Sequence, residues 1–592
     1  MTKTKFAKYC KDLIKTRAPL ERGLFVKVPQ VDFGVYNPTI ARNKGYQVYP
    51  PTGLECLSNA VDGMGVDFDI LDMNYHFLKK AQDSSYDAST WMQILEKRIE
   101  EIKPDIIGVS NTFRMEEANF FEVLNYLNKR DGNPIIVVGG QNATYESKRI
   151  LGSTLADFVC QREGEEKMRT IVDQLSGERK LNVAPGILFN YDSDVLTTGD
   201  EPDQVKLKGS LVKQHKNLPI EDYHNVGTLG PFSRMAGDET PFAATFLNRG
   251  CRAQCAFCTV RDYHGIGVRG REVDDVLDEL TYLHFEKGIG HFEFVDDDIT
   301  RDKDRLRAVL NGIQERNMDV SWSAQNGIIA SSLDEQILQE MQDSNCIGFK
   351  VGVESGNPAL LKSIRKPGTI KSFKAFSGRA QKFPKLFMSY NYIIGFPEEN
   401  FEMMRRTYDF SGEMNPDWSS FSTYIPLGEN KEDGDEAENF IPVKSEKGMQ
   451  ISGEDKVVKG YDVFGLPAGE IPSKEQVKEV WFTFNMQRNF MRNKNLLPGG
   501  DPKKFIRWMN VLQKTYSLNA DMPFFLAMAH RLEKNDYEAE EFLDKTRDNL
   551  TPYWEERFDQ FDLTPHLNDF PKSSKKARET LEFLAENPAG FD

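Results

Sequence analysis

The 592-residue sequence predicts an α/β fold with two strand-rich regions and a mostly helical C-terminal domain. Three observations support this prediction. Between residues 21 and 180, short apolar segments alternate with helix-like segments, which is typical of a doubly wound, Rossmann-like parallel sheet. The alternation resumes over residues 241–430, with polar residues after the strands, as in a partial (β/α)6 barrel. Over residues 473–592 the apolar residues recur at helical spacing.

The composition is that of a soluble globular protein, and we expect the protein in the cytoplasm. Hydrophobic residues make up 39% of the chain and aromatic residues 11%. No apolar run approaches the roughly 20 residues that a bilayer span requires, and the N-terminus lacks the apolar core of a signal peptide. We therefore expect no membrane span. The formal net charge of −16 argues against a nucleic-acid partner, because phosphate binding needs a positive surface.

The first strand-rich region should place a ligand beyond the C-terminal ends of its strands, as doubly wound sheets do. Residues 1–20 precede it as a short basic helix, and residues 181–240 follow it as a polar, irregular linker. Within the region we expect strands at 23–29, 68–72, 105–110, 134–140 and 156–160, and helices at 50–64, 90–102, 116–129 and up to residue 175.

The second region should place its chemistry at the same end of its strands. Strands are expected at 241–247, 292–298, 320–325, 348–355 and 388–397, with 424–426 as the sixth, and a helix at 272–286.

The rest of the chain is expected to be a charged, exposed insertion followed by helices. The insertion covers residues 431–472. The helices are interpreted as a core packed on the barrel, with a substrate-selecting lid as the alternative, and His530 as a core residue. The charged tail after Leu563 is expected to be loosely held. The helices are predicted at 473–493, 501–516, 521–534 and 536–548, with an aromatic stripe of Trp481, Phe484 and Phe490.

Three of the seven cysteines stand together in a C-x3-C-x2-C run. Cys251, Cys255 and Cys258 follow directly after the strand expected at 241–247. Thiolates at this spacing can surround one face of a compact metal centre, and soft sulfur selects iron–sulfur clusters or zinc. Three ligands for a four-iron cubane leave one iron open to a small molecule. The alternative is a structural zinc site, with His264 as the fourth ligand.

With Phe257 the motif becomes C-x3-C-x-aromatic-C, and at these residues the chain resembles the radical S-adenosylmethionine (SAM) enzymes. The resemblance implies a [4Fe–4S] cluster held by Cys251, Cys255 and Cys258. It also implies that SAM chelates the open iron and is cleaved by one electron to a 5′-deoxyadenosyl radical. An electron donor such as flavodoxin or ferredoxin is then expected.

Several later strand ends resemble the same family. Glu354 and Ser355 stand where the family contacts the methionyl group or ribose of SAM, and Gln325 ends a strand that often touches SAM. Gly395 lies in a stretch, 394–398, that resembles the G-x-P-x-E element near the adenine. The resemblance implies SAM contacts for these four residues and for Phe257; the alternative for each is a structural polar residue.

Three consecutive carboxylates, Asp296, Asp297 and Asp298, end the strand expected at 292–298. They could bind a divalent metal. The preferred interpretation is that one orients SAM or a loop, while the others cap the helix that begins near Asp302.

Residues 20–180 resemble the cobalamin-binding domain that precedes the radical SAM domain in one large subfamily. Ser110-Asn111-Thr112 and the later Gly139-Gly140 match the S-x-L…GG spacing of such domains, with Thr112 in place of the leucine. The resemblance implies that Ser110, Gly139 and Gly140 contact the corrin and its tail. Physically, glycines let the backbone approach a large ligand, and a serine hydroxyl can bond a buried polar group. Tyr49–Leu54 and Gly164-Glu165 also match.

The match departs from the family pattern at the first strand. No D-x-H-x-x-G follows that strand, because residues 30–35 offer an aspartate but no histidine. If cobalamin binds, we expect the cobalt to lack a histidine ligand from the protein. The alternative is a flavodoxin-like sheet that has lost its cofactor and only packs.

The resemblance to class B radical SAM methyltransferases implies methylation of an unactivated carbon in a small molecule or peptide. One SAM would methylate cob(I)alamin, a second would yield the adenosyl radical, and the substrate radical would take methyl from methylcobalamin. Acid–base groups cannot activate such a carbon, so the cofactors must supply the chemistry that activates it. The alternatives are a non-methylating oxidative cyclase or rearrangement enzyme, and a zinc-stabilised, non-catalytic scaffold.

Overall fold

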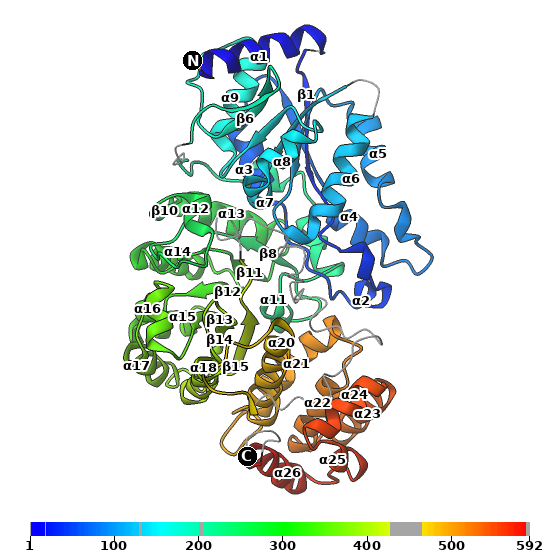
Figure 1. Ribbon diagram of the computed structural model, residues 1–592, viewed down its shortest axis with the longest axis vertical. Helices are drawn as coiled ribbons and strands as arrows, with labels where there is room; N and C mark the ends of the chain where they lie inside the picture. The colour runs from blue at the N-terminus through cyan, green and yellow to red at the C-terminus, as the bar shows by residue number, and fades with distance from the viewer. Residues whose placement is uncertain (1, 18, 130–132, 201–204, 427–464, 588–592) are drawn as a thin grey trace.

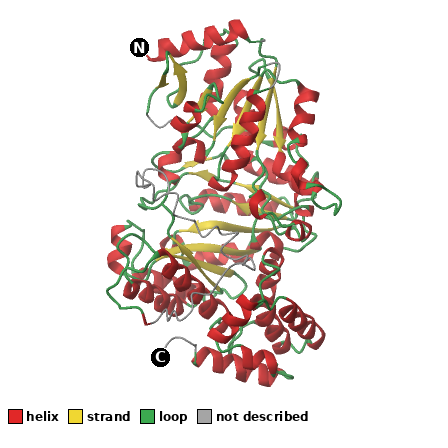
Figure 2. Cartoon of the chain, turned by 45° about the vertical axis from the view of Figure 1, so that its right-hand side comes forward, coloured by secondary structure: helices red, strands yellow, loops and turns green. Residues whose placement is uncertain are grey.

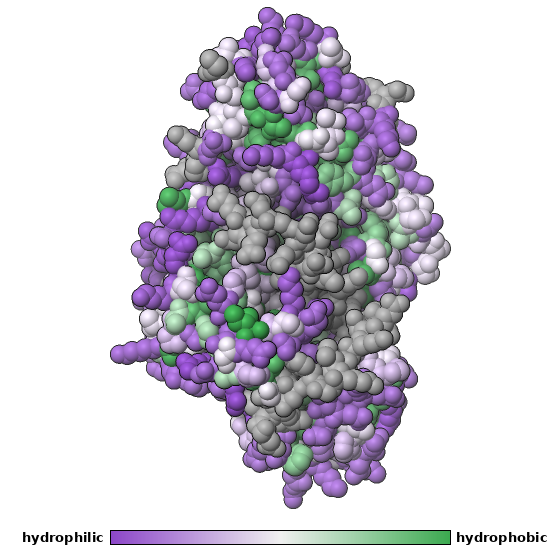
Figure 3. Space-filling model, viewed as in Figure 1, coloured by the Kyte–Doolittle hydropathy of each residue, from purple (hydrophilic) through white to green (hydrophobic). Residues whose placement is uncertain are grey.

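The computed structural model describes residues 2–17, 19–129, 133–200, 205–426 and 465–587. The N-terminal sheet lies at one end of an elongated molecule, a second sheet occupies the middle, and C-terminal helices form the other end (Figures 1 and 2). Most of the surface in Figure 3 is hydrophilic, in keeping with a chain that is 28% charged. Each helix in the described ranges is too short or too polar to cross a bilayer.

The first sheet has seven strands in the order β2-β1-β3-β4-β5-β6-β7, and β1 to β5 pair in parallel. Alternate residues of each strand enter two different cores: Leu24 and Val26 face one, and Phe25 faces the other. Helices therefore cover both faces, which confirms the doubly wound fold. The strands are β1 (Arg22–Lys27), β2 (Asp67–Asp72), β3 (Ile106–Ser110), β4 (Ile135–Gly139), β5 (Phe158–Cys160), β6 (Ile187–Tyr191) and β7 (Asp194–Thr197).

The helices of this half mostly match the predicted segments. The exceptions are four short helices, α2, α4, α7 and α8, which lie in segments where no helix was predicted. The helices are α1 (Thr2–Thr16), α2 (Pro38–Arg42), α3 (Thr52–Val61), α4 (Met73–Lys80), α5 (Gln93–Ile102), α6 (Glu117–Asn128), α7 (Gln141–Tyr145), α8 (Ser147–Gly152) and α9 (Glu165–Leu175), with 3-10 turns η1 (Phe33–Val35), η2 (Ala88–Thr90) and η3 (Arg114–Glu116).

The stretch expected as an irregular linker, residues 181–240, contains the antiparallel hairpin β6–β7. The two turn residues, Asp192 and Ser193, both have positive φ angles, 49° and 70°, as a tight hairpin turn requires. Asp-Ser lacks the glycine that normally marks such a turn, so the pattern gave no hairpin signal. The sheet is therefore mixed at this edge. The stretch also holds α10 (Val212–His215), η4 (Ile220–Asn225) and α11 (Pro231–Met235).

The second sheet has six parallel strands in the order β15-β14-β13-β12-β11-β8, as expected for a partial (β/α)6 barrel. Its sixth strand is β15 (Trp418–Thr423), so the prediction of residues 424–426 was wrong. The other strands are β8 (Phe242–Thr245), β11 (His291–Phe294), β12 (Ser321–Ile328), β13 (Cys346–Glu354) and β14 (Phe387–Ile394), with a small hairpin of β9 (Asn248–Arg249) and β10 (Arg269–Gly270).

The helices of the barrel region alternate with these strands and cover the outer face of the sheet (Figure 1). The predicted helix 272–286 is α13, and α14 begins next to Asp302 as expected. The helices of this region are α12 (Val260–His264), α13 (Val273–Phe285), α14 (Lys303–Glu315), the 3-10 turn η5 (Ala330–Ser332), α15 (Glu335–Asp343), α16 (Pro358–Ser363), α17 (Ile370–Ala380) and α18 (Phe401–Met414).

The open edge of β15 is closed by a helix instead of another strand. Asn489 accepts a hydrogen bond from Ser419 N at 2.7 Å and donates one to Ser419 O at 2.7 Å. Trp481 Nε1 donates to Phe421 O at 2.8 Å. Because unpaired edge groups are costly when buried, these side chains allow the sheet to end here.

The C-terminal helices pack around α22 and onto the barrel, which confirms the prediction of a packed core. Phe484 and Phe490 are buried, and the His530 ring stacks on Phe542 with 5.3 Å between centroids. The expectation of a loosely held tail was wrong: Leu581 and Leu584 are buried at helical spacing that the surrounding charges had obscured. Of the predicted insertion 431–472, residues up to 464 lie outside the described ranges. The helices are α20 (Lys474–Met486), the π-helix η8 (Gln487–Met491), α21 (Pro502–Thr515), α22 (Asp521–Leu532), α23 (Asp536–Asp548), α24 (Pro552–Gln560), α25 (Thr564–Asn568) and α26 (Ser574–Glu586).

Candidate functional site

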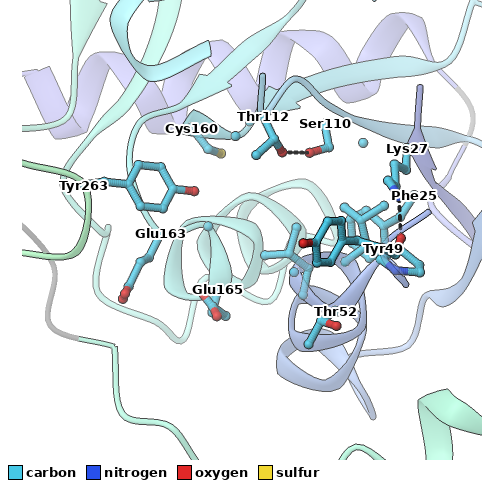
Figure 4. A pocket seen from close by; sticks show the side chains of 18 of the residues that line it. Phe25, Lys27, Tyr49, Thr52, Ser110, Thr112, Cys160, Glu163, Glu165 and Tyr263 are labelled. Atoms are coloured by element: carbon cyan, nitrogen blue, oxygen red, sulfur yellow. Dashed lines mark hydrogen bonds between the residues drawn. The ribbon is translucent and has the colours of Figure 1, made fainter. Parts of the chain in front are cut away.

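A cavity of about 620 Å³ lies where the C-terminal strand ends of the two sheets face each other. The first sheet contributes Lys27, Ser110 and Gly139, at the ends of β1, β3 and β4 (Figure 4). The second sheet contributes Val295 and Asn326, after β11 and within β12. Both folds bind ligands at these strand ends, so one ligand-filled space can serve both halves.

One side of the cavity, here called the slot, is lined by apolar side chains of the first sheet and of helices α3 and α9. A Cβ atom added at Gly53, in the first turn of α3, would meet nothing within 4 Å. The space in front of Gly53, on this side of the cavity, is therefore open. The walls of the slot include Phe25, Leu54, Leu57, Val137, Cys160 and Met168.

Ser110, Gly139 and Gly140 all line the cavity, but the two glycines differ. Gly140 has a φ of 108°, and a Cβ there would lie 2.4 Å from Asn111 O, so the backbone turn itself requires glycine. A Cβ at Gly139 would make only an ordinary contact, 3.8 Å from Cys160 O. The Ser110 hydroxyl lies 3.3 Å from that of Thr112 (Figure 4).

Lys27 is a cavity residue that the motif analysis missed. It ends β1 and is only 9% exposed. Its Nζ donates to Tyr49 O at 2.5 Å and lies 3.3 Å from an Asp72 carboxylate oxygen (Figure 4 shows the first contact). The signal that could have revealed it is a lysine at the end of an otherwise apolar strand. Lys27 therefore places a positive charge, which Asp72 balances, at the end of β1 beside the cavity.

The three clustered cysteines lie on the loop between β9 and α12, and none of them is in a disulfide. Burial raises the pKa of the Cys255 thiol to about 11, and the nearby Cys258 and Cys251 sulfurs add to the rise. The thiols thus share one electrostatic neighbourhood, and this donor set fits an iron–sulfur cluster with three protein ligands. Their side chains are not drawn together in these conformations: within the described ranges, no three His, Cys, Asp or Glu side chains form a metal-binding group.

His264, the fourth ligand in the zinc alternative, is bonded elsewhere. Its Nδ1 lies 2.6 Å from Glu163 Oε1 in the first half of the chain, and its Nε2 lies 3.7 Å from Asp297 Oδ2. The ring is therefore oriented by carboxylates across the cavity, which does not support the zinc site.

Two of the three consecutive aspartates hold the cysteine loop and the third lies near His264, so a metal-binding role for them is not supported. Asp296 accepts hydrogen bonds from Leu247 N at 3.0 Å and Asn248 N at 2.6 Å, where the loop begins. Asp298 pairs with Arg252, between the first two cysteines, at 2.9 Å.

The expectation that two of these aspartates cap the following helix was wrong. Asp302 itself caps α14, by accepting from Arg305 N at 3.0 Å. The reason is distance along the chain: the three carboxylates end β11 several residues before the helix, and the backbone amides nearest to them belong to the cysteine loop.

Two neighbouring residues expected to contact SAM, Glu354 and Ser355, have different surroundings. Glu354 bonds Lys366 Nζ at 2.8 Å, and the positive charge of Lys366 lowers the pKa of the Cys255 thiol against the larger effect of burial. Ser355 is fully buried, with its hydroxyl 3.1 Å from that of Thr407. Glu354 is therefore near the cysteines, while the Ser355 side chain is committed to packing.

Gln325 links the two halves of the chain. Its amide nitrogen donates to the Tyr49 hydroxyl at 2.5 Å and to Leu229 O at 2.6 Å. The side chain is 8% exposed. The structure therefore places this predicted SAM residue in a contact between β12 and the segment that precedes α3.

Phe257 and Gly395 lie at one junction. The Phe257 ring stacks edge-on against Phe396, with 5.7 Å between centroids, and this contact joins the cysteine loop to the end of β14. Glu399, which motif analysis missed, accepts from Gly395 N at 2.7 Å and Phe396 N at 3.1 Å. It is the second glutamate of Gly-Phe-Pro-Glu-Glu, and this doubling hid which glutamate completes the G-x-P-x-E element.

Two family models match the chain. The Radical SAM superfamily model matches residues 245–411, and the B12 binding domain model matches residues 38–172. Among curated relatives, an uncharacterized methyltransferase of Pyrococcus horikoshii is 28% identical over 334 residues, 56% of this chain and 69% of that protein. The cytidylyl-2-hydroxyethylphosphonate methyltransferase of Streptomyces wedmorensis is 24% identical over 408 residues, 64% and 76% of the two chains.

Two solved structures share the fold over most of their length. The radical SAM methyltransferase TsrM of Kitasatospora setae, with cobalamin and a [4Fe-4S] cluster bound, has a TM-score of 0.54 at 16% identity, covering 89% of this chain and 99% of that one. The cobalamin-dependent enzyme OxsB, with aqua-cobalamin and SAM bound, has a TM-score of 0.56 at 15% identity, covering 97% and 84%. The two family models thus place a B12-binding domain ahead of a radical SAM domain, the chain shares the fold of two solved cobalamin-dependent radical SAM enzymes, and it is an enzyme.

Proposed function

We propose that this enzyme is a methyltransferase that places a methyl group from SAM on an unactivated carbon of a small molecule or peptide. The observation that carries the proposal is the single cavity bounded by the strand ends of both sheets, because it lets two cofactors and a substrate meet. Curated methyltransferase relatives support the reaction type. We place the enzyme in the cytoplasm, where a flavodoxin or ferredoxin supplies electrons.

In this proposal Cys251, Cys255 and Cys258 hold a [4Fe–4S] cluster with one iron left for SAM. When bound, the cluster with SAM supplies one-electron cleavage, and cobalamin supplies methyl carriage. The chain's own contribution is to orient the loop. Asp298 fixes Arg252 between the cysteines, and Asp296 fixes the start of the loop. Lys366 adds a positive charge beside the thiolates, which favours the ionised sulfurs that a metal requires.

Ser110 and Gly139 would contact the corrin and its tail, with the apolar slot receiving the flat base of the tail. Gly140 shapes the turn that presents Gly139. The cavity lining within the described residues includes one histidine, His264, and Glu163 holds its Nδ1. This supports the expectation that the cobalt lacks a histidine ligand from the protein.

For SAM we propose direct contacts from Glu354, Phe257 and Gly395, which adjoin the cysteine loop. The side chains of Ser355 and Gln325 are already bonded within the protein, so they would act by holding the ends of β13 and β12 in place.

Anaerobic reconstitution tests the proposal. We expect about four irons per chain, a corrin absorption spectrum after incubation with cobalamin, and SAM cleavage on reduction. The Cys251→Ala/Cys255→Ala/Cys258→Ala variant should lose iron and cleavage, whereas Cys346→Ala, a buried cysteine outside the loop, should keep both. A product heavier by one methylene identifies methyl transfer. Iron and SAM cleavage that survive in the triple variant would contradict the cluster assignment.

A further inference from the structure

The wall of the cavity between the two sheets contains an ionic cluster that joins the halves of the chain. From the first half come Glu163, in the turn between β5 and α9, and Glu165, the first residue of α9. From the second half come Arg249, His264 and Arg269, which lie on the segment 248–270 that also carries the three cysteines. We call these five residues the latch.

The residues of the latch make close contacts between identified atoms. Glu163 Oε2 accepts from Arg269 Nη1 at 2.7 Å, and Glu163 Oε1 lies 2.6 Å from His264 Nδ1. Glu165 Oε1 accepts from Arg249 Nη1 at 2.5 Å. Glu163 thus binds the end of α12 and the strand β10, and Glu165 binds β9 at the start of the segment. The two glutamates fix the whole segment against the first sheet.

Burial makes these ion pairs more than surface contacts. The Glu163 side chain is 2% exposed, and that of Glu165 is 10% exposed. Burial alone would raise the pKa of the Glu163 carboxyl, but hydrogen bonds from Arg269 and His264 bring it down to about 2. Removing the charge would therefore leave the half-buried Arg269 guanidinium without its carboxylate partner, which is costly.

The latch also faces the ligand space. Glu163, Glu165, Arg249 and His264 all line the cavity, and Figure 4 shows both glutamates on the wall beneath Cys160 and Tyr263. A ligand that fills this cavity lies against the groups that hold the cysteine segment. Filling the cavity can then favour the arrangement in which the segment is held.

We propose that Glu163 and Glu165 are positioning residues that couple occupancy of the corrin cavity to SAM binding at the cysteine loop. The inference rests on the proposed function. Coupling of this kind is reciprocal, so cobalamin should raise the affinity for SAM by the same factor by which SAM raises the affinity for cobalamin. We expect a factor of about five or more, the lower end for coupled sites.

The test measures SAM binding by equilibrium dialysis in the reconstituted full chain, with and without cobalamin, together with the EPR spectrum of the reduced cluster. In the wild type, cobalamin should lower the Kd for SAM about fivefold or more and change the EPR signal given with SAM. In Glu163→Gln, with iron and corrin content retained, both responses should disappear.

Glu166→Gln is the matched control. Glu166 lies in the same stretch of chain, is half exposed and pairs with Arg169 on its own helix at 3.5 Å. It should respond to cobalamin as the wild type does. If Glu163→Gln does not fold, Glu165→Gln, which breaks only the Arg249 pair, should reduce the coupling in part.

The outcomes separate the two proposals. A wild type that binds iron and corrin but shows the same Kd for SAM with and without cobalamin overturns the coupling and leaves the proposed function standing. Full coupling in Glu163→Gln and Glu165→Gln also overturns it. A wild type that takes up no iron or no corrin overturns the proposed function, and the coupling with it.

Discussion

Replacing Asn489 by leucine should loosen β15, the edge strand of the barrel. The Asn489 side chain is fully buried and makes two hydrogen bonds of 2.7 Å to the backbone of Ser419. Leucine fills a similar volume, so little cavity forms, but Ser419 N–H and C=O lose their partners. Each buried unpaired group costs about 1–3 kcal/mol, so the expected local loss is about 2–6 kcal/mol.

The loss is best measured by hydrogen exchange, because a chain with several domains has no single two-state unfolding free energy. Peptides that cover residues 418–423 should exchange about 30-fold faster or more, since every 1.4 kcal/mol is a factor of ten. Asn125→Leu is the control: Asn125 is exposed on α6 and bonds only Phe121 O of its own helix. Equal exchange at β15 in the two variants would refute the reasoning that the helix satisfies this edge.

The remaining predictions concern the cavity and one buried carboxyl. Gly53→Leu should project into the open slot and abolish the corrin spectrum while leaving the melting temperature unchanged, whereas Gly378→Leu, at a helical glycine that also has no close neighbours, should leave both unchanged. Gly140→Ala should weaken the turn after β4 by about 1–3 kcal/mol because of the positive φ of Gly140, and so speed hydrogen exchange of peptides covering residues 135–145, while Gly139→Ala should not; equal increases in exchange would contradict the assignment. Burial raises the pKa of Asp521 to about 7. The folded state thus keeps a proton that the unfolded chain loses near pH 4, and this contribution to stability falls as the pH rises from about 4 to 7. Asp521→Asn should therefore gain on the wild type across that window, by on the order of 1.4 kcal/mol per pKa unit, in melts recorded at a series of pH values; parallel curves would count against it.

The parts of the fold that could be predicted from the sequence are those set by local pattern. Strands such as residues 106–110 and 135–139 are apolar because both of their faces are buried. Such apolar runs can be recognised from the sequence alone. The cysteine spacing was equally legible, because a loop that holds one metal centre must keep its ligands close in sequence. These features rest on neighbours in the chain.

The features that escaped prediction rest on contacts between distant residues. β15 has the sequence Trp-Ser-Ser-Phe-Ser-Thr, which alternates too weakly to predict an edge strand. Nothing in these residues indicates that Asn489 will hydrogen-bond the backbone of Ser419. Glu163 meets His264 across 101 positions, and its turn, which was noted only for the match of Gly164-Glu165 to cobalamin domains, gave no sign of this contact. Gln325 was assigned to a ligand because it ends a strand, while Tyr49 in the other half takes its amide.

The contacts that Asp296 and Asp298 make with the cysteine loop have a consequence for the enzyme after it loses its cluster. Asp296 and Asp298 bind the loop and the residues just before it through backbone amides and Arg252, so these contacts form without iron. Zinc fingers behave differently, since they unfold when their metal is withdrawn. A molecule stripped by oxygen should keep this loop in shape and accept a fresh cluster from a repair system, without a chaperone.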